Sequence, residues 1–338
     1  MRQTLILTGD VNFLNVKNPA VPFAQVADVL GKADVVFGNL ESCLSDPPPD
    51  YSYDQEGFFA GPQIGDALKL GNFHAVGCAN NVTYGADTIR ASLARLESLG
   101  IKYTGAGLNR KAARAPVLLE RHNVRFGFLQ YTSVFWPSGH AAGERSPGVA
   151  TIKAHTAYQP RVANRAGVPP VILTSADEHD LEEFKSDIAS LRRQADLVVS
   201  SHHWGQGEEV LQYQQQIARA AIDSGADIVM GHGVHYPLAI EVYKEKPIFY
   251  GLGCFSFHTG HRGRAFGNWV GLMARVILED RHVMKVTCSP VRHNEANETI
   301  IRSAQEEQEA MEHLVELSEK FKTTLDISGD EVLVWQKA

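Results

Sequence analysis

The strongest constraint on the fold is an alternation of short apolar runs with amphipathic segments. Runs rich in β-branched residues, such as TLILTG and ADVVFGN, alternate with segments of helical period, such as ADTIRASLARLESLG. Strands and helices that alternate in this way form βαβ units around a largely parallel sheet. The pattern predicts helices at about residues 22–30, 63–70, 86–100, 152–166, 179–194 and 211–224.

The rhythm changes after Tyr236, where strand-like runs follow one another without helices between them. PLAIEVY, IFYGLG, NWVGLMARVILED and HVMKVTCS indicate an antiparallel portion or a second sheet. A charged amphipathic helix at about 301–322 and a strand-like tail follow. The chain has no repeat or clear linker, so its 338 residues predict one domain, with a C-terminal helix and tail over 301–338.

Composition excludes several classes of protein. The formal net charge of -7 argues against a nucleic-acid-binding surface, because such surfaces are usually basic. No run approaches the roughly 18 apolar residues of a membrane span, and the apolar N-terminal run is too short for a signal peptide. We therefore expect a soluble, cytoplasmic protein. Four cysteines without a CxxC pair fit reduced thiols, and only Cys254 lies beside a histidine cluster.

Polar side chains follow five of the predicted strands, at the point where each strand ends. In open α/β sheets ligands bind at the carboxyl edge of the strands, so these side chains are expected to meet at one place. They are Asp10, then Asn39 and Glu41, then Asn80 and Asn81, then His202 and His203, and finally His232 and His235.

Oxygen and imidazole ligands together suit Mn²⁺, Fe²⁺ or Zn²⁺. The set exceeds what one tetrahedral ion takes, and a bridging carboxylate can serve two ions about 3.5–4 Å apart, so two ions are favoured. Each residue also has a simpler explanation. Asp10 can cap a helix, Asn80 and Asn81 can form a turn, and GHGVH can be a glycine-rich turn. His202 and His203 cannot point the same way in a strand, so one of them is structural or supporting.

The same segments resemble the CapA-type family of capsule and poly-γ-glutamate synthesis proteins. The resemblance runs in order from about residue 3 to 258. It is carried by ILTGDVNF, FGNLESCLS, ANN, LVVSSHHWGQGEE and GADIVMGHGVHYPLAIEVYKEKPIFYGLGCFSF. It implies the calcineurin-like metallophosphoesterase fold, an α/β two-sheet αββα sandwich with mixed sheets flanked by helices. The implied metal-site positions are Asp10, Glu41, Asn81, His203, His232 and His235, with Asn12 as a weaker candidate.

The sequence departs from the family pattern at three neighbouring polar positions. Val82 stands where the family has a histidine, which in related phosphoesterases is thought to protonate the leaving group or stabilise the transition state. Gly233 replaces a histidine of the GHHPH pattern, and Cys254 replaces the asparagine of LGNF. His202 is the nearest candidate to replace the missing acid, and Asn80 is the second candidate catalytic side chain.

These features favour metal-dependent hydrolysis of a phosphate ester or related anionic small molecule by activated water. Two alternatives remain open at this point. One is an amide or acyl hydrolase or transferase linked to polyglutamate chemistry, acting on a short polymer. The other is a non-catalytic metal-binding or assembly protein, for which Val82 and Gly233 argue.

Substrate recognition is expected from the segment that follows LGCFSF. Arg262 and Arg264 suit capture of phosphate or carboxylate, because guanidinium binds both bidentately. His258 and Cys254 are the other candidates for the pocket lining. The irregular stretch 136–170, with Trp136 and His140, is predicted to be a loop over the site followed by the helix at 152–166. The sequence does not indicate an oligomeric state.

Overall fold

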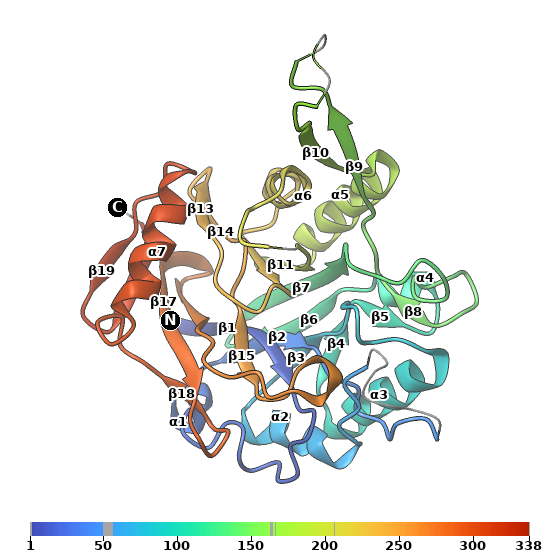
Figure 1. Cartoon of the computed structure of the whole chain (residues 1–338). Coiled ribbons are helices and arrows are strands. Elements are labelled where there is room, and N and C mark those ends of the chain that lie inside the picture. Colours follow the sequence, from blue (N-terminus) through green and yellow to red (C-terminus); the bar gives the residue numbers. More distant parts are fainter. Residues whose placement is uncertain (1, 50–56, 163–164, 166, 206, 338) are drawn as a thin grey trace.

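The computed structural model describes residues 2–49, 57–162, 165, 167–205 and 207–337. Two large β-sheets pack face to face, and helices cover their outer faces (Figure 1). This arrangement confirms the expected two-sheet α/β sandwich. Each central strand is buried on both faces. Its side chains point alternately into the core shared by the two sheets and into the core beneath a layer of helices.

The larger sheet has ten strands in the order β19-β20-β17-β16-β1-β2-β3-β4, with β15 also paired to β1 and β18 to β17. Strands β1 to β4 and β15 run parallel, whereas β16 and β17 are antiparallel. Its strands are β1 (Arg2–Asn12), β2 (Val35–Leu40), β3 (Ala75–Gly77), β4 (Lys102–Thr104), β15 (Cys254–Phe257), β16 (Gly271–Glu279), β17 (His282–His293), β18 (Thr299–Ile301), β19 (Asp326–Ser328) and β20 (Glu331–Gln336).

The smaller sheet has six strands in the order β13-β14-β12-β11-β7-β6, with a parallel centre and antiparallel edges. They are β6 (Val117–Arg121), β7 (Val124–Thr132), β11 (Leu197–His203), β12 (Ile228–His232), β13 (Ile240–Tyr243) and β14 (Lys246–Phe249). The expected change to helix-free strands after Tyr236 is therefore confirmed. It supplies edge strands to both sheets.

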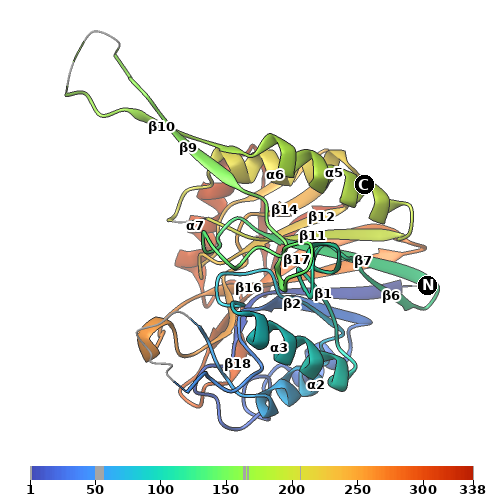
Figure 2. The same ribbon diagram turned by 90° about the vertical axis from the view of Figure 1, so that its right-hand side faces the viewer.

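Helices α1 (Ala27–Gly31), α2 (Asp66–Leu70) and α3 (Ala86–Leu99) cover the ten-stranded sheet, and α5 (Glu178–Arg192) and α6 (Gln212–Asp223) cover the six-stranded sheet (Figures 1 and 2). α7 (Gln308–Glu319) closes one side of the core between the sheets. A short helix α4 (Arg110–Ala113) and a two-stranded pair, β5 (Ala106–Gly107) with β8 (Gly148–Val149), lie beside α3.

Alternate side chains of β1 enter the two cores on either side of the sheet. Leu5 and Leu7 of β1 enter the shared core, and Ile6 between them faces the core under the helices. Phe37 of β2 stacks on Phe128 of β7, with ring centroids 4.5 Å apart and an interplanar angle of 14°. These contacts fix the distance between the sheets, and with it the distance between the side chains at their carboxyl ends.

The predicted helix at 152–166 is wrong. The chain instead forms a hairpin, β9 (Ala154–Gln159) with β10 (Val171–Ala176), that projects beyond the sandwich (Figure 2). Its base is held by α6, because Gln212 and Gln216 accept hydrogen bonds from the backbone of Thr174 and Ala176. Residues 163, 164 and 166 of the predicted helix lie outside the described part. In the described residues, no helix is both long and apolar enough to span a membrane.

Candidate metal centre

Asp10 joins the two sheets at the carboxyl ends of their strands. It lies near the end of β1, and its Oδ2 accepts a hydrogen bond of 3.1 Å from the backbone N–H of Gly233, just beyond β12. The same oxygen lies 3.0 Å from Nδ1 of His235, while Oδ1 lies 3.7 Å from Nδ1 of His232. A buried carboxylate thus faces two imidazoles across the seam between the sheets.

Two groups of ligand-type side chains share this carboxylate. The first contains Asp10, His203 and His232, whose ligand atoms all lie within 4.8 Å of one another. The second contains Asp10, His235 and Cys254, within the same limit. In both groups the side chains come from different strands or from the loop after β12, so only the folded chain assembles them.

Glu41 lies next to the second group. It directly follows β2 and is buried, and its Oε2 is 3.9 Å from Nδ1 of His235. His235 itself packs its ring against Phe257, with centroids 4.5 Å apart, and has a φ of +66°. Five of the sequence-predicted ligands, Asp10, Glu41, His203, His232 and His235, are therefore brought together.

The charge states of the cluster suit a cation. Burial alone would raise the pKa of Asp10, but the hydrogen bond to His235 and the nearby His232 and His203 outweigh it and lower that pKa, so Asp10 is a carboxylate. Burial lowers the pKa of His203 to about 4, although Asp10 opposes this. Burial also lowers the pKa of His232 well below its ordinary value. Neutral imidazoles beside a carboxylate are the protonation states that metal binding needs.

The cluster is held by a network of two side-chain amides, of which Asn39 is one of the predicted strand-end residues and Gln130 is not. Asn39 of β2 donates from Nδ2 to Oδ1 of Asp10 at 2.7 Å, and the same nitrogen is 3.4 Å from Nδ1 of His203. Gln130 of β7 donates to Oδ1 of Asn39 at 2.8 Å and accepts a hydrogen bond from the backbone of Ala79. A glutamine inside the apolar run FGFLQYTS was the available signal, because a buried polar side chain needs a partner.

His232 is also fixed by its outward nitrogen. Its Nε2 lies 2.8 Å from Oγ of Ser201 and 3.1 Å from Nε2 of Gln130. Oγ of Ser201 can accept a proton from Nε2 or donate one to it, whereas the amide nitrogen of Gln130 can only donate. Nδ1 lies 3.2 Å from Nδ1 of His203. Partners of this kind fix the ring orientation of metal-binding histidines.

The two asparagines after β3 have different environments. The carbonyl oxygen of the Asn80 side chain accepts hydrogen bonds from Val82 and Thr83, and its Nδ2 donates to the backbone of Leu40 at 2.8 Å. These bonds give Asn80 the turn-forming role and do not support the catalytic one. Oδ1 of Asn81, in contrast, is buried and has no hydrogen-bond partner among the described residues. A buried oxygen of this kind is destabilising unless something coordinates it, which fits a metal ligand.

His202 faces away from the cluster. Its ring stacks on Trp204, with centroids 4.7 Å apart, and contacts Phe184 of α5 edge-on. Its Nε2 lies 2.8 Å from Oγ of Ser200. Side chains alternate along β11, so His203 enters the seam and His202 enters the core under α5. This placement corrects the expectation that His202 replaces the missing acid, which rested on proximity in sequence alone.

Asn12 anchors a loop. Its Nδ2 donates to the carbonyl of Thr259 at 2.7 Å, and its Oδ1 accepts from the backbone of Leu14 at 2.8 Å. The nitrogen and the oxygen of this amide are therefore both hydrogen-bonded to backbone groups, and this arrangement does not support metal binding by Asn12. The anchored loop carries Arg262 and Arg264. His258 lies beside Thr259 and packs edge-on against His293, so it does not join the cluster.

The positions that depart from the family pattern have local explanations. Val82 is buried among apolar side chains beneath α3, where a histidine would be desolvated. Gly233 has a φ of +102°, and a Cβ there would lie 2.8 Å from the ring of His203. A side chain at position 233 is therefore incompatible with the present position of His203.

The irregular stretch after β7 is hydrogen-bonded to the turn that contains Asn81. The indole N–H of Trp136 donates to the carbonyl of Asn81 at 3.1 Å. His140 is fully buried. Its Nδ1 accepts from the backbone of Trp136 at 3.0 Å, and its Nε2 is 3.0 Å from the carbonyl of Thr83. The predicted loop over the site is thus ordered by a neutral histidine.

Replacing His140 by glutamine is expected to flatten the acid limb of the stability curve. Burial lowers the pKa of His140 to about 4 from an ordinary 6.5, although backbone hydrogen bonds oppose the shift. Between these values the unfolded chain binds a proton that the folded chain excludes, so the free energy of unfolding falls as pH falls from about 6.5 to 4. Below about pH 4 both states bind the proton, so the stability that depends on a neutral His140 has been lost completely.

Urea unfolding of the metal-free protein between about pH 4.5 and 6 checks this effect. The slope of the unfolding free energy against pH should be smaller in His140→Gln by about 1 kcal/mol per pH unit. His282→Gln, at an exposed histidine at the start of β17, is the matched control and should follow the wild type. Equal slopes in wild type and His140→Gln would contradict the assignment of a buried, neutral His140.

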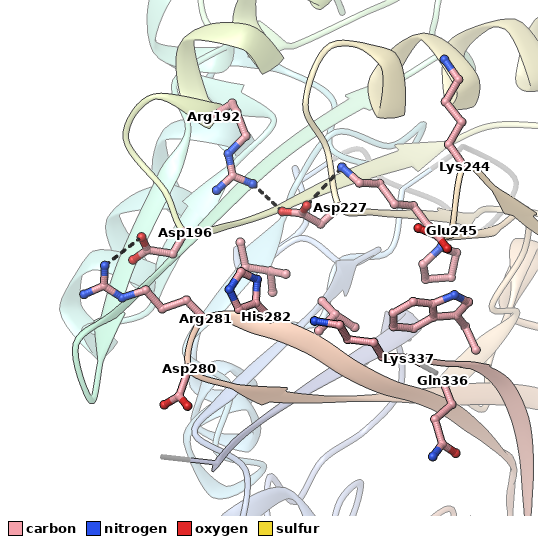
Figure 3. Close-up of a pocket in the computed structure, with 15 residues that line it drawn as sticks. Arg192, Asp196, Asp227, Lys244, Glu245, Asp280, Arg281, His282, Gln336 and Lys337 are labelled. Carbon is pink, nitrogen blue, oxygen red and sulfur yellow. Dashed lines mark hydrogen bonds and ion pairs between the residues drawn. The ribbon is translucent and has the colours of Figure 1, made fainter.

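A cavity of about 820 Å³ lies away from the cluster, at the opposite ends of β11, β12 and β14 (Figure 3). Three of its basic side chains are paired with acids. Arg192 and Lys246 both contact Asp227, and Arg281 contacts Asp196. The lining also holds Lys244 and Lys337 together with Glu245 and Asp280, so acidic and basic side chains are mixed and the cavity does not have the character of a strong anion site. A smaller cavity of about 410 Å³ adjoins the cluster and is lined by His235, Tyr236, Phe266, Trp269, Leu314 and other residues.

Solved structures with a similar fold include a hypothetical protein from Thermus thermophilus, with a TM-score of 0.51 and 13% identity over 86% of this chain and 98% of that one. Another is a novel phosphatase from Mycoplasma pneumoniae, with a TM-score of 0.51 and 11% identity over 86% and 93% of the two chains. At such low identity the likeness concerns the fold alone. It confirms a phosphatase-like arrangement of the sheets.

Relatives in sequence include uncharacterized protein y4sH of Sinorhizobium fredii, 28% identical over 75% of this chain and 66% of its own length. Capsule biosynthesis protein CapA of Bacillus anthracis is 27% identical over 76% of this chain and 60% of its own. PGA biosynthesis protein CapA of Bacillus subtilis is 29% identical over 70% and 57%. The chain thus spans about three fifths to two thirds of the length of these curated relatives.

The profile of one protein family matches most of the chain. It is described as bacterial capsule synthesis protein PGA_cap, and it matches residues 4–259, from β1 through the end of β15. That range contains Asp10, His203, His232, His235 and Cys254, so the whole candidate centre lies in the family's own part of the sequence. The chain belongs to the PGA_cap family of bacterial capsule synthesis proteins and has a phosphatase-like fold.

Proposed function

We propose that this chain is a metal-dependent hydrolase with a dinuclear centre, acting on a phosphate ester of a small anionic molecule. The observation that carries the proposal is the carboxylate of Asp10 shared by two groups of ligand atoms. A shared carboxylate between two such groups is the arrangement by which hydrolases hold two ions side by side. One ligand group alone would support a structural ion equally well.

The proposed ligands divide between two metal positions. His203 and His232 would hold one ion with Asp10, and His235 and Glu41 would hold the other. Two divalent ions supply activation of water and neutralise the charge that develops on a phosphoryl oxygen. Mn²⁺, Fe²⁺ and Zn²⁺ suit the mixed ligands. Asn39, Gln130 and Ser201 then keep the ligands oriented, through the hydrogen bonds described above.

The cavity beside His235 supports a small molecule as the substrate. Its walls are mostly aromatic and aliphatic, so it suits an apolar or ring-shaped group next to the ester. Arg262 and Arg264 lie in the loop that leads to Phe266, one of these walls, and would meet an anionic group. A long polyanion fits such an apolar wall poorly, and Glu208 at its rim would repel one.

Amide-bond chemistry is the second candidate. It is favoured by the relatives named for capsule and PGA biosynthesis. The same ligands would activate water, or another nucleophile, toward a γ-glutamyl amide. The two candidates differ in the bond broken, so a substrate panel separates them.

The test combines metal content with turnover. Protein reconstituted with Mn²⁺, Fe²⁺ or Zn²⁺ is expected to bind two ions and to hydrolyse members of a phosphomonoester and phosphodiester panel. His203→Ala should lose one ion and turnover, whereas His122→Ala, at an exposed histidine, should lose neither. Cleavage of γ-glutamyl peptides alone would favour the second candidate. A wild type that binds no metal after reconstitution, and whose behaviour the His203→Ala substitution leaves unchanged, would overturn both candidates.

A further inference from the structure

Cys254 lies in the second ligand group, at a position where the family pattern has asparagine. It is the first residue of β15, and its backbone pairs with Asp10 of β1 in the parallel register. Its sulfur lies within 4.8 Å of ligand atoms of Asp10 and His235 and 3.5 Å from the carbonyl of His235. The side chain is fully buried. The thiol therefore lies inside the cluster and not at its rim.

The other cysteines have different surroundings. Cys43 contacts the carbonyl of Val82 at 3.1 Å, Cys78 packs in the core under the helices, and Cys288 packs in the core between the sheets. In the part of the chain that the structure describes, none of these three belongs to a group of metal-ligand side chains. Buried cysteine usually acts as a small apolar residue. Cys254 is the exception, since a carboxylate and an imidazole face it.

We propose that Cys254 is a thiolate ligand of the second metal position, which gives that position a preference for Zn²⁺, Fe²⁺ or Co²⁺ over Mn²⁺ and Mg²⁺. This inference rests on the proposed metal centre. Soft thiolate ligands select ions of the first kind, whereas carboxylate and carbonyl oxygens suit the second. When the ion binds, the S–H bond breaks, the proton passes to solvent and a sulfur–metal bond forms.

The alternative role for Cys254 is that of a nucleophile assisted by His235. Two observations oppose it. The sulfur is fully buried at the start of a strand paired with β1, so a substrate carbonyl or phosphoryl group has no access to it. Nδ1 of His235 is directed at Asp10, 3.0 Å away, and at Glu41. A metal ion can reach the sulfur from within the cluster, where a substrate cannot.

Cobalt spectroscopy tests the inference on the whole protein. Metal-free wild type is titrated with Co²⁺ under argon, and two features are recorded. Visible ligand-field bands report a bound ion, and a near-ultraviolet sulfur-to-cobalt charge-transfer band reports a thiolate ligand. We expect both in the wild type, with a single thiolate ligand in each chain. Cys254→Ser should lose the charge-transfer band and keep ligand-field bands from the His203 and His232 position.

The matched control is Cys288→Ser, which removes a buried thiol outside the cluster and should keep both features. Affinity for Zn²⁺ at the second position should fall at least about tenfold in Cys254→Ser, with little change for Mn²⁺. X-ray absorption at the zinc edge of the wild type, which should show a sulfur neighbour, gives a result even if a variant fails to fold.

The outcomes are distinguishable. Ligand-field bands without charge transfer in the wild type would overturn the thiolate and leave the metal centre standing. The absence of both features at saturating Co²⁺ would overturn the centre and the thiolate together. A wild type without sulfur coordination, combined with loss of turnover in Cys254→Ser, would assign the nucleophile role instead.

Discussion

Replacing Asp10 by asparagine is expected to remove both metal ions, because both ligand groups contain this carboxylate. The change keeps the size of the side chain and removes its charge. Loss of a partner that merely supports a ligand costs about 10–100-fold in metal affinity or activity, so loss of a shared ligand should exceed this at both positions. Turnover should fall with metal content.

The amide would also disturb the metal-free network. The Asp10 oxygens accept from Asn39 and from the backbone of Gly233, and an asparagine offers an N–H to one of these donors. A buried donor left without a partner costs on the order of 1–3 kcal/mol. A lower melting temperature is therefore expected even without metal.

Elemental analysis after reconstitution is the measurement. Asp34→Asn provides the control, since Asp34 accepts a backbone hydrogen bond from Thr4 at the other end of the same sheet, away from the cluster. Asp34→Asn should retain two ions. If Asp10→Asn retained one tightly bound ion, the two positions would not share Asp10, and the dinuclear arrangement would fail.

Replacing Gly233 by alanine should weaken both the fold and metal binding. The residue has a φ of +102°, which side chains other than glycine rarely adopt, and such backbone strain costs on the order of 1–3 kcal/mol. The added Cβ would lie 2.8 Å from the ring of His203. Because His203 is held by Asn39 and His232, the ring cannot move without disturbing a ligand.

Gly100→Ala separates the two effects. Gly100 ends α3 with a φ of +72°, and a Cβ there meets nothing within 4 Å. It should lose about 1–2 kcal/mol of stability from backbone strain alone and bind metal like the wild type. Chemical unfolding of both variants measures the loss of stability, and metal titration measures the loss of metal affinity. Equal metal affinity in Gly233→Ala and the wild type would contradict the close packing of position 233 against His203.

The sequence was sufficient to predict the helices α3, α5 and α6 and the strands that carry the cluster, because apolar periodicity is strong there. It also predicted that Asp10, His203 and His232 meet, since parallel strands place their carboxyl ends at one edge. The hairpin β9–β10 escaped prediction because contacts with α6 hold it, and such tertiary contacts leave no local pattern.

The errors within the site have the same origin. The catalytic role predicted for His202 rests on its adjacency to His203 in sequence. The alternation of side chains along β11 instead directs it toward Phe184 and Trp204. Asn12 follows Asp10 by two residues and shares its strand, yet its amide is used by the loop at Thr259. Asn39 and Gln130 have partners that are distant in sequence. Their importance depends on distances between strands that only the packed sheets define.

The position of Asp10 between the sheets bears on the order of events during folding. Its partner at Gly233 is 223 residues further along the chain and directly follows β12 of the other sheet. The proposed ions therefore meet a complete ligand set only after the chain has been synthesised beyond His235 and Cys254 and both sheets have docked. Metal would therefore bind late, to a chain that is already folded, and the ions retained would depend on the free metal available at that moment as well as on the preference of the ligands.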